Sequence, residues 1–179
     1  MTKCIDCFIP YNGEIQTLRT VEGLLTEEEV ANVYLLTTNA VAQKVDGCQM
    51  LVVPNHASSA TMKRIVQHAK SEFTLIYSKQ EMLLFGYKAL QRMVKVARDL
   101  GSGMVYADHY HYRAGELCKA PVIDYQEGSL RDDFDFGSVI LYSTAALKEA
   151  ASRMSEPYEA AGRYDLRLKI AQRYTIDHI

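Results

Sequence analysis

The sequence lacks the features that would direct it to a membrane or to nucleic acid. No apolar run approaches the roughly 20 residues needed to span a bilayer. The first residues, Met1–Asp6, lack the long apolar region of a signal peptide. The net charge of −2 gives no electrostatic case for a nucleic-acid or anionic-membrane partner. We therefore expect a cytoplasmic chain without a transmembrane segment and without a nucleic-acid partner.

Motifs of common nucleotide-binding folds are also missing. The chain contains neither G-x-G-x-x-G nor G-x-x-x-x-G-K-[ST], so a small-molecule enzyme on another doubly wound fold has no motif to support it. Asp135-Phe136-Gly137 matches a kinase tripeptide, but no Gly-rich loop or His-Arg-Asp segment accompanies it. We reject a kinase on that ground.

The cysteines give no sign of redox or zinc chemistry. There are four, and Cys4 and Cys7 form a C-x-x-C. In a redox motif such a pair sits at a helix N-terminus, where the dipole lowers the thiol pKa. Here it lies in an apparent strand, whose residues three apart point to opposite faces. We interpret both as buried core thiols, and no second pair has zinc spacing.

Short apolar segments alternate with segments of helical periodicity from the start of the chain. The predicted strands of this part are Cys4–Pro10, Asn32–Thr37, Met50–Pro54, Phe73–Tyr77 and Met104–Ala107. Between them, helical spacing predicts helices over Ile15–Leu25, Met62–Ala69 and Leu90–Leu100. Ser58 or Ser59 is suited to cap the second helix, and Gly101 to end the third.

The pattern changes after Ala107. Residues Tyr110–Ile123, with a turn at Arg113–Glu116, predict a hairpin or meander. We then expect a strand at Ser138–Tyr142, a helix over Thr144–Arg153, a helix with Pro157 in its first turn, and a strand at Thr175–Ile179. Together these elements predict an α/β three-layer sandwich with a mostly parallel, mixed central sheet. We expect one domain over residues 1–179, cut from a longer chain because it ends at a strand.

The strand and turn Cys7-Phe8-Ile9-Pro10-Tyr11-Asn12-Gly13-Glu14 resemble the opening strand of family 2 glycosyltransferases, which have the GT-A fold. That family opens with an apolar strand followed by Pro, Tyr-Asn and an acidic residue. Further segments resemble the family's segments in the same order and extend the likeness over nearly the whole chain: Val33–Thr38, Asn55–Phe73, Phe73–Met93, Met104–Tyr110 and Tyr164–Leu168. There is also some similarity to two-domain bacterial glycosyltransferases with a divergent first domain.

The resemblance implies a GT-A domain that transfers a sugar from a nucleotide diphosphate to an acceptor hydroxyl with inversion. In the family, one carboxylate binds the base, an Asp-x-Asp holds Mg²⁺ or Mn²⁺ against the diphosphate, and a third carboxylate takes the acceptor's proton. The matching positions here are Thr37-Thr38, Ser78-Lys79-Gln80 and Gly162-Arg163. All three acidic sites are replaced, and no aspartate lies between Asp46 and Asp99.

The resemblance implies the binding residues, which lie where ligands bind in such sheets, outside the carboxyl ends of the strands. For the nucleotide sugar we expect Pro10, Tyr11, Asn12, Glu14, Thr37, Ser78, Lys79 and Asp108. In this interpretation Tyr11 stacks on the base, and Asn12 or Glu14 forms hydrogen bonds to it. Plain turn chemistry is the alternative for the Tyr-Asn-Gly-Glu segment. Lys79 either contacts a phosphate in place of the cation or is a solvated surface lysine.

Two carboxylates are candidates for catalysis. Asp135 belongs to the acidic cluster Arg131–Gly137, which either lines the acceptor pocket or caps a short helix from Ser129. Asp165 is the carboxylate nearest to the family's catalytic pair, with helix capping or solvent exposure as its alternative role.

We assign no metal ligand with certainty. Mg²⁺ or Mn²⁺ would lack its usual carboxylates. Asp108, His109 and His111 have suitable side chains, but on a strand the two histidines share a face and Asp108 points away. His56 and His68 are interpreted as structural or surface residues.

Two functions remain open from the sequence. One is a glycosyltransferase-type domain that uses a nucleotide sugar and a glycan acceptor, with or without a metal. The other is a catalytically degenerate GT-A module that binds a glycan or partner, or supports a fused C-terminal catalytic domain. A downstream copy of the pattern with an intact Asp-x-Asp would favour a divided role.

Overall fold

The computed structural model describes residues 3–126 and 134–179. Seven strands form one sheet in the order β3-β2-β1-β4-β8-β5-β9, and β6 and β7 form a separate ribbon. In chain order the strands are β1 Ile5–Pro10, β2 Val30–Thr37, β3 Cys48–Val52, β4 Phe73–Tyr77, β5 Met104–Tyr106, β6 His109–Arg113, β7 Glu116–Ala120, β8 Val139–Ser143 and β9 Ile176–His178.

The central strands are buried on both faces. In β1, Phe8 packs into the core on one side of the sheet, while Cys7 and Ile9 pack into the core on the other. The same alternation occurs in β8, where Leu141 faces one core and Ile140 and Tyr142 face the other. Near-continuous apolar strands are typical of a parallel sheet that is covered on both faces.

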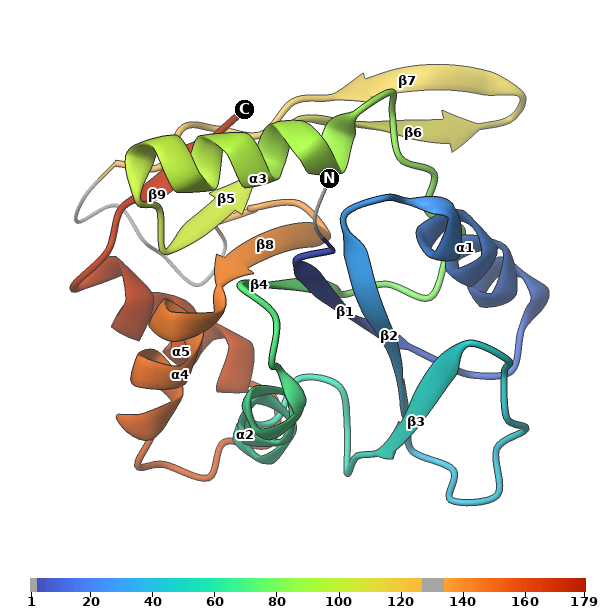
Figure 1. Cartoon of the computed structure of the whole chain (residues 1–179), viewed down its shortest axis with the longest axis horizontal. Helices are drawn as coiled ribbons and strands as arrows, with labels where there is room; N and C mark the ends of the chain where they lie inside the picture. Colours follow the sequence, from blue (N-terminus) through green and yellow to red (C-terminus); the bar gives the residue numbers. More distant parts are fainter. Residues whose placement is uncertain (1–2, 127–133) are drawn as a thin grey trace.

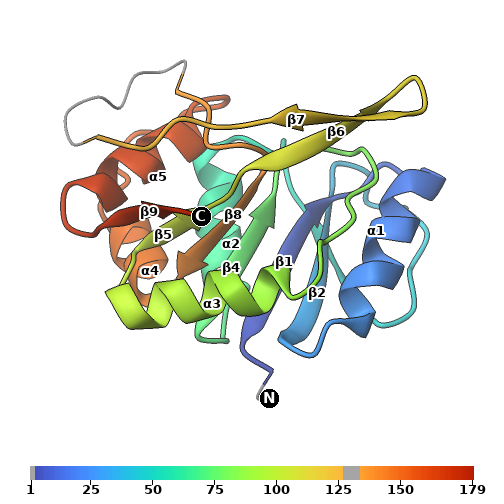
Figure 2. The ribbon, with the colours of Figure 1, turned by 90° about the horizontal axis from the view of Figure 1, so that it is seen from above.

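Helices cover both faces of the sheet. They are α1 Ile15–Thr26, α2 Ser59–His68, α3 Ala89–Leu100, α4 Thr144–Ser152 and α5 Gly162–Ala171. The buried stripes of α1 and α3 pack into one core, and those of α2, α4 and α5 pack into the other. Figure 1 shows α2, α4 and α5 gathered on one side of the strands, and Figure 2 looks down on α3 as it crosses the opposite side. The result is the three-layer sandwich that the sequence predicts.

One strand of the sheet runs against its neighbours. β8 is antiparallel to both β4 and β5, whereas β1, β2, β3 and β4 are mutually parallel and β5 is parallel to β9. The residues just before β8 therefore lie at the same edge as the carboxyl ends of β4 and β5. The β6–β7 ribbon leaves from this edge and projects beyond the sheet (Figure 1).

A buried carboxylate organises the opposite edge. Asp6 in β1 is completely buried. It accepts hydrogen bonds from Asn32 Nδ2 at 2.8 Å, from the backbone N–H groups of Lys70 and Ser71 at 2.7 and 2.8 Å, and from the Ser71 hydroxyl at 2.8 Å. Full hydrogen bonding is what allows a charged group to be buried at tolerable cost. These bonds tie β1 to β2 and to the turn before β4.

Most expected elements are present at close to their expected bounds. The strand Phe73–Tyr77, the hairpin around Arg113–Glu116 and the helix end at Gly101 are confirmed. Ser58 caps α2, since its Oγ accepts the N–H of Thr61 at 3.2 Å. The short helix expected from Ser129 begins outside the described residues.

Two expectations are corrected. Pro157 is not in a helix, because α5 begins only at Gly162. The intervening chain pairs instead with the start of α2, where the Ser59 N–H donates to the Tyr158 carbonyl at 2.9 Å. Cys4 and Cys7 are both buried, as expected, but they belong to the same core cluster, because Cys4 precedes β1 and the strand's register is irregular at its start.

Within the described residues, no helix is both long and apolar enough to cross a membrane.

Gly162 provides a test of how α5 is seated. A Cβ added there would lie 2.3 Å from the backbone carbon of Ser58 and 2.3 Å from the backbone nitrogen of Ser59, neither of which can move aside. We expect Gly162→Ala to lower the free energy of unfolding by about 2 kcal/mol through this overlap, as measured by urea denaturation.

Gly23, in the interior of α1, is the matched control. A Cβ there meets no atom within 4 Å. Gly23→Ala should raise the free energy of unfolding by about 0.5–1 kcal/mol, because alanine is the better helix former. Equal effects of the two substitutions would contradict the tight seating of α5 on α2.

Candidate functional site

A cleft of about 560 Å³ lies at the carboxyl edge of the parallel strands. Its walls come from the segments that follow β1, β3 and β4. The residues that line it are Pro10, Asn12, Glu14, Gln16, His56, Ser78, Lys79, Gln80 and Glu81. We refer to this cavity as the cleft.

The turn after β1 is locked to the segment after β4. Asn12 accepts the N–H of Glu14 through its side-chain oxygen at 3.0 Å, which is an Asx turn. Its Nδ2 donates to Gln80 Oε1 at 3.2 Å. Gln16, in the first turn of α1, accepts the Met82 N–H at 3.2 Å. These bonds hold two walls of the cleft in a fixed relation.

Lys79 is the only cationic side chain that lines the cleft within the described chain. The backbone before it is fixed, because the Ser78 N–H donates to the Ser138 carbonyl at 2.9 Å. Its side chain is 43% exposed, and the nearest carboxylate is that of Glu81, at 3.9 Å. An exposed pair at this separation contributes little energy, so the ammonium group remains able to bind an anion.

Three residues take positions that differ from expectation. Tyr11 packs into the core with 4% of its surface exposed, so its ring is not positioned to stack on a base. Thr37 is also buried, and its hydroxyl oxygen accepts the Asn39 N–H at 3.1 Å. His56, which no sequence pattern placed in a site, lines the cleft, and its Nε2 lies 3.1 Å from the Leu36 carbonyl oxygen.

The segment before β8 brings Asp135 to the same edge. Its Oδ1 accepts the Gly137 N–H at 2.7 Å. His109, at the start of β6, lies beside Gly137, since a Cβ on that glycine would be 3.5 Å from His109 Nδ1. Burial, more than the charge of His111, lowers the pKa of His109, while Asp135 acts to raise it and Lys79 to lower it. Both Asp135 and Lys79 are thus within electrostatic reach of His109, which is neutral at pH 7.

Asp108 belongs to a different cluster. Its Oδ1 accepts the Val122 N–H at 2.9 Å and lies 3.0 Å from His178 Nε2. The other ring nitrogen of His178 lies 2.6 Å from Asp124 Oδ1. The backbone hydrogen bond from Val122, followed by His178, lowers the pKa of Asp108. This carboxylate therefore fastens β9 to the chain after β7, and it is not among the residues that line the cleft.

Asp165 is a largely buried, paired residue of α5. Its Oδ1 accepts a hydrogen bond from the ammonium group of Lys169, one turn along the helix. Its other oxygen is buried without a hydrogen-bond partner in the described chain. Asp165, like Asp108 and Asp135, is not among the residues that line the cleft.

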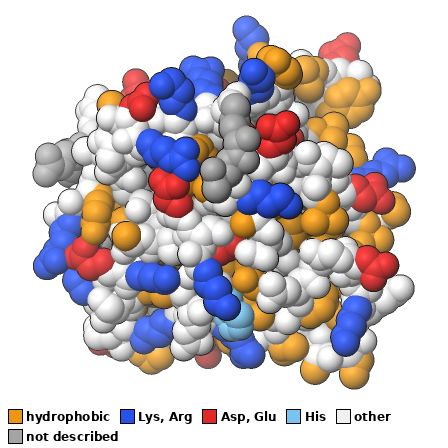
Figure 3. Space-filling model, viewed as in Figure 1, with side chains coloured by type: hydrophobic (Ala, Val, Ile, Leu, Met, Phe, Trp, Pro, Cys, Tyr) orange, Lys and Arg blue, Asp and Glu red, His pale blue; other side chains and the backbone are white. Residues whose placement is uncertain are grey.

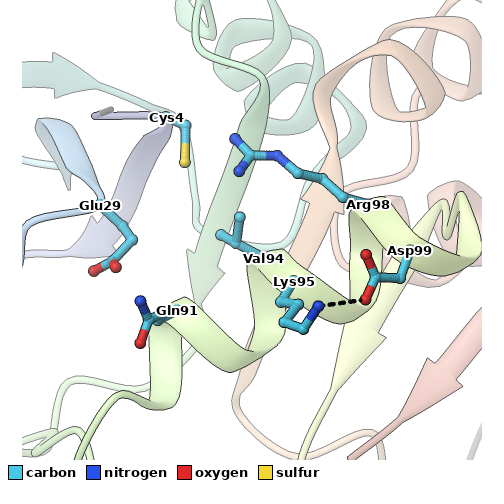
Figure 4. A pocket seen from close by; sticks show the side chains of 7 residues that line it. All are labelled: Cys4, Glu29, Gln91, Val94, Lys95, Arg98 and Asp99. Carbon is cyan, nitrogen blue, oxygen red and sulfur yellow. Dashed lines mark hydrogen bonds and ion pairs between the residues drawn. The ribbon is translucent and has the colours of Figure 1, made fainter. Parts of the chain in front are cut away.

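A second hollow, of about 460 Å³, lies at the amino edge of the sheet (Figure 4). It is lined by Cys4, Glu29, Gln91, Val94, Lys95, Arg98 and Asp99. Lys95 donates to Asp99 at 2.9 Å, and Arg98 pairs with Glu72 at 2.5 Å. Most of its charged groups are thus neutralised by each other or by a neighbour, unlike Lys79 in the cleft.

Comparison with known proteins identifies the fold. No protein-family model and no curated protein matches the sequence. Among solved structures, residues 1–349 of S. aureus TarS, a GT-A glycosyltransferase, align with a TM-score of 0.68 at 12% identity, over 100% of this chain and 58% of that one.

Nucleotidyltransferases align as well. The 2-C-methyl-D-erythritol 4-phosphate cytidylyltransferase of Francisella tularensis has a TM-score of 0.60 at 8% identity, over 98% of this chain and 89% of that one. The enzyme of the same name from Thermus thermophilus has a TM-score of 0.56 at 16% identity, over 97% of this chain and 86% of that one. At such identities the likeness shows the fold alone. The chain has the GT-A-like fold of nucleotide-diphospho-sugar transferases.

Many proteins of the family that the sequence resembles hold a divalent cation with carboxylates after β4, and the residues here do not fit one. The corresponding segment carries Ser78, Lys79 and Gln80, and a lysine ammonium is a donor that cannot ligate a cation. Glu14 and Glu81 are the carboxylates of the cleft, and across residues 3–126 and 134–179 no three metal-binding side chains converge. We therefore derive no step through a metal ion.

The role of Asp108 as a fastener can be tested through pH. Because its folded-state pKa is lowered, its contribution to stability is complete above the unfolded value of about 3.9 and is lost as pH falls through the folded value. Asp108→Asn should therefore lower the melting temperature at pH 6. The difference in melting temperature between this variant and the wild type should disappear below about pH 4.

Asp46→Asn, which removes the same charge from an exposed position, should leave the melting temperature close to wild type throughout. A gap between Asp108→Asn and wild type that stays constant with pH would contradict a role for the carboxylate charge.

Proposed function

We propose that this chain is a glycosyltransferase-type domain whose cleft binds the diphosphate of a nucleotide sugar without a metal ion. The observation that carries the proposal is the position of Lys79 at the end of β4, within the cleft and only loosely paired with Glu81. Ligands in open α/β sheets bind at this edge. The solved structures of the same fold include proteins named as nucleotidyltransferases and one glycosyltransferase.

Lys79 takes the role that a divalent cation has elsewhere. A diphosphate leaving group gains negative charge as its bond to the sugar breaks, and a fixed cation lowers the energy of that transition state. Asn12 and Gln80, which are held together by a hydrogen bond, present amide groups to the same space. His56 extends the wall along the segment after β3.

Asp135 is the proposed base. In an inverting transfer the acceptor oxygen forms a bond to the anomeric carbon, the bond from that carbon to the phosphate oxygen breaks, and the acceptor's proton passes to a carboxylate. Asp135 accepts the Gly137 N–H and lies at the same edge as the neutral His109. Asp165, in contrast, is already paired with Lys169.

The second candidate is a degenerate module that retains the fold but not turnover. The observation that favours it is the engagement of Asp108 and Asp165 in pairs within the protein, which takes these two candidate carboxylates out of catalysis. Such a module would bind a glycan or a partner, or support a fused C-terminal domain. Turnover by the isolated chain discriminates between the two.

The first experiment is a calorimetric titration with uridine, guanosine and cytidine diphosphates and their sugars, with and without Mn²⁺. We expect binding of at least one nucleotide whose affinity does not change with Mn²⁺. Lys79→Ala should weaken it by about tenfold or more, because a charge-assisted contact to phosphate is lost.

Lys63→Ala, on the exposed face of α2, is the control and should bind as the wild type does. Strong tightening by Mn²⁺ would show that carboxylates hold a metal after all. The absence of binding at millimolar nucleotide would refute the nucleotide-sugar proposal for this chain.

The role of Asp135 as the catalytic base is tested by a rate measurement. The rate is that of nucleoside diphosphate release from whichever sugar nucleotide binds in the titration. We expect Asp135→Asn to lower this rate by about 10²–10⁴-fold, because an amide cannot accept the proton, while the dissociation constant of the donor stays unchanged. Asp46→Asn is the charge control. If Asp165→Asn causes the loss and Asp135→Asn does not, the assignment of the base is wrong.

A further inference from the structure

Helix α5 carries two arginines that have no carboxylate partner among the described residues. Arg163 and Arg167 are one turn apart and so share a side of the helix. Across the described residues, no ion pair includes either of them, whereas Arg153 and Arg173 pair with Glu149, and Lys169 pairs with Asp165. The neighbouring charges of α4, α5 and the chain after α5 are thus paired, and among the described residues these two are not.

Arg167 has a buried donor with no acceptor. Its guanidinium carbon lies 5.2 Å from the centre of the Phe136 ring, a cation–π contact that fixes the direction of the side chain. Its Nε is buried and has no hydrogen-bond partner in the described chain. An unsatisfied buried donor is costly and calls for an acceptor, such as a water or an ion.

Arg163 lies in a similarly unfavourable environment. Burial, and then the positive charge of Arg167, lower the pKa of Arg163, and the phenolic Tyr142 opposes this only weakly. Two like charges that share a partly buried region repel each other unless a counter-charge is present. An anion between them would relieve both the repulsion and the unmet hydrogen bonding.

The two arginines lie close to the wall of the cleft in the fold. Gly162, just before Arg163, donates its N–H to the Ala57 carbonyl at 2.8 Å, and Ala57 follows His56 of the cleft wall. On the other side, Phe136 follows Asp135. The arginines therefore lie between the wall after β3 and the proposed base. Lys and Arg side chains are spread over the whole face drawn in Figure 3, including the side that carries α4 and α5.

We propose that Arg163 and Arg167 bind a phosphate monoester group of the second substrate, so that the acceptor is a phosphorylated rather than a neutral molecule. This inference rests on the proposed function for the meaning of a second substrate. Two guanidinium groups suit a tetrahedral oxyanion, because each can donate two parallel hydrogen bonds to it. The amino end of α5 adds a favourable dipole to the same region.

The test is a calorimetric titration of the chain with glycerol 3-phosphate, with glycerol as the neutral comparison. We expect glycerol 3-phosphate to bind and glycerol not to bind. Arg163→Gln and Arg167→Gln should each weaken binding by about tenfold or more. Arg163→Lys should bind more weakly than wild type, because lysine keeps the charge but loses the planar fork.

Arg173→Gln is the matched control, since it removes an arginine from the chain just after the same helix, where Glu149 pairs with it. It should bind glycerol 3-phosphate within about twofold of wild type, because a paired arginine outside the site contributes little to binding. If Arg173→Gln weakens glycerol 3-phosphate binding as much as Arg163→Gln and Arg167→Gln do, the loss of affinity reflects net charge alone and the proposal is overturned. Urea denaturation of each variant confirms that the fold is retained.

The donor diphosphate is the other source of a phosphate group. If Arg163→Gln and Arg167→Gln weaken nucleoside diphosphate binding as strongly as glycerol 3-phosphate binding, the arginines serve the donor, and the acceptor assignment is overturned. Lys79→Ala should affect the nucleotide and spare glycerol 3-phosphate. Nucleotide binding without glycerol 3-phosphate binding would refute this inference alone. Glycerol 3-phosphate binding without nucleotide binding would refute the proposed function and, with it, the acceptor role, and would leave the arginine pair as a phosphate site only.

Discussion

A single buried carboxylate sets the geometry on which the cleft depends. Asp6 lies in β1 with no exposure to solvent, and every hydrogen bond that it accepts comes from β2 or from the turn before β4. Leaving such a charge unsatisfied would be prohibitive, so the three strands must keep one alignment. The opposite ends of β1 and β4 are thereby held level, and the side chains that follow them meet across the cleft.

The fold follows from the sequence more fully than the site does. Strand Phe73–Tyr77 and the capping by Ser58 depend on local patterns, and both are present in the structure. Pro157 is misleading, because the start of α5 is decided by the contact of Gly162 with the backbone of α2 and not by local propensity. The burial of Tyr11 is likewise a tertiary result, since a Tyr-Asn-Gly turn has the same sequence whether the ring points outward or into the core.

The site combines residues that no spacing rule brings together. Gln16 in α1, His56 after β3 and Glu81 after β4 meet only because three parallel strands end at one edge. Lys79 was accessible to sequence reasoning, because it stands where the resemblance expects acidic residues. The lack of an ion pair for Arg163 and Arg167 within the described residues was not, because it depends on which carboxylates the folded chain engages elsewhere.

The reversed direction of β8 decides which parts of the chain meet at the cleft. Because β8 enters the sheet from the functional edge, the chain before it contributes its own side chains there, alongside the ends of strands that run the other way. One part of the candidate site comes from the β1–β4 portion of the chain, and the other from the residues just before β8 and at the start of α5. The two stretches are joined by backbone hydrogen bonds from Ser78 to Ser138 and from Gly162 to Ala57, so a change of position in one is transmitted to the other.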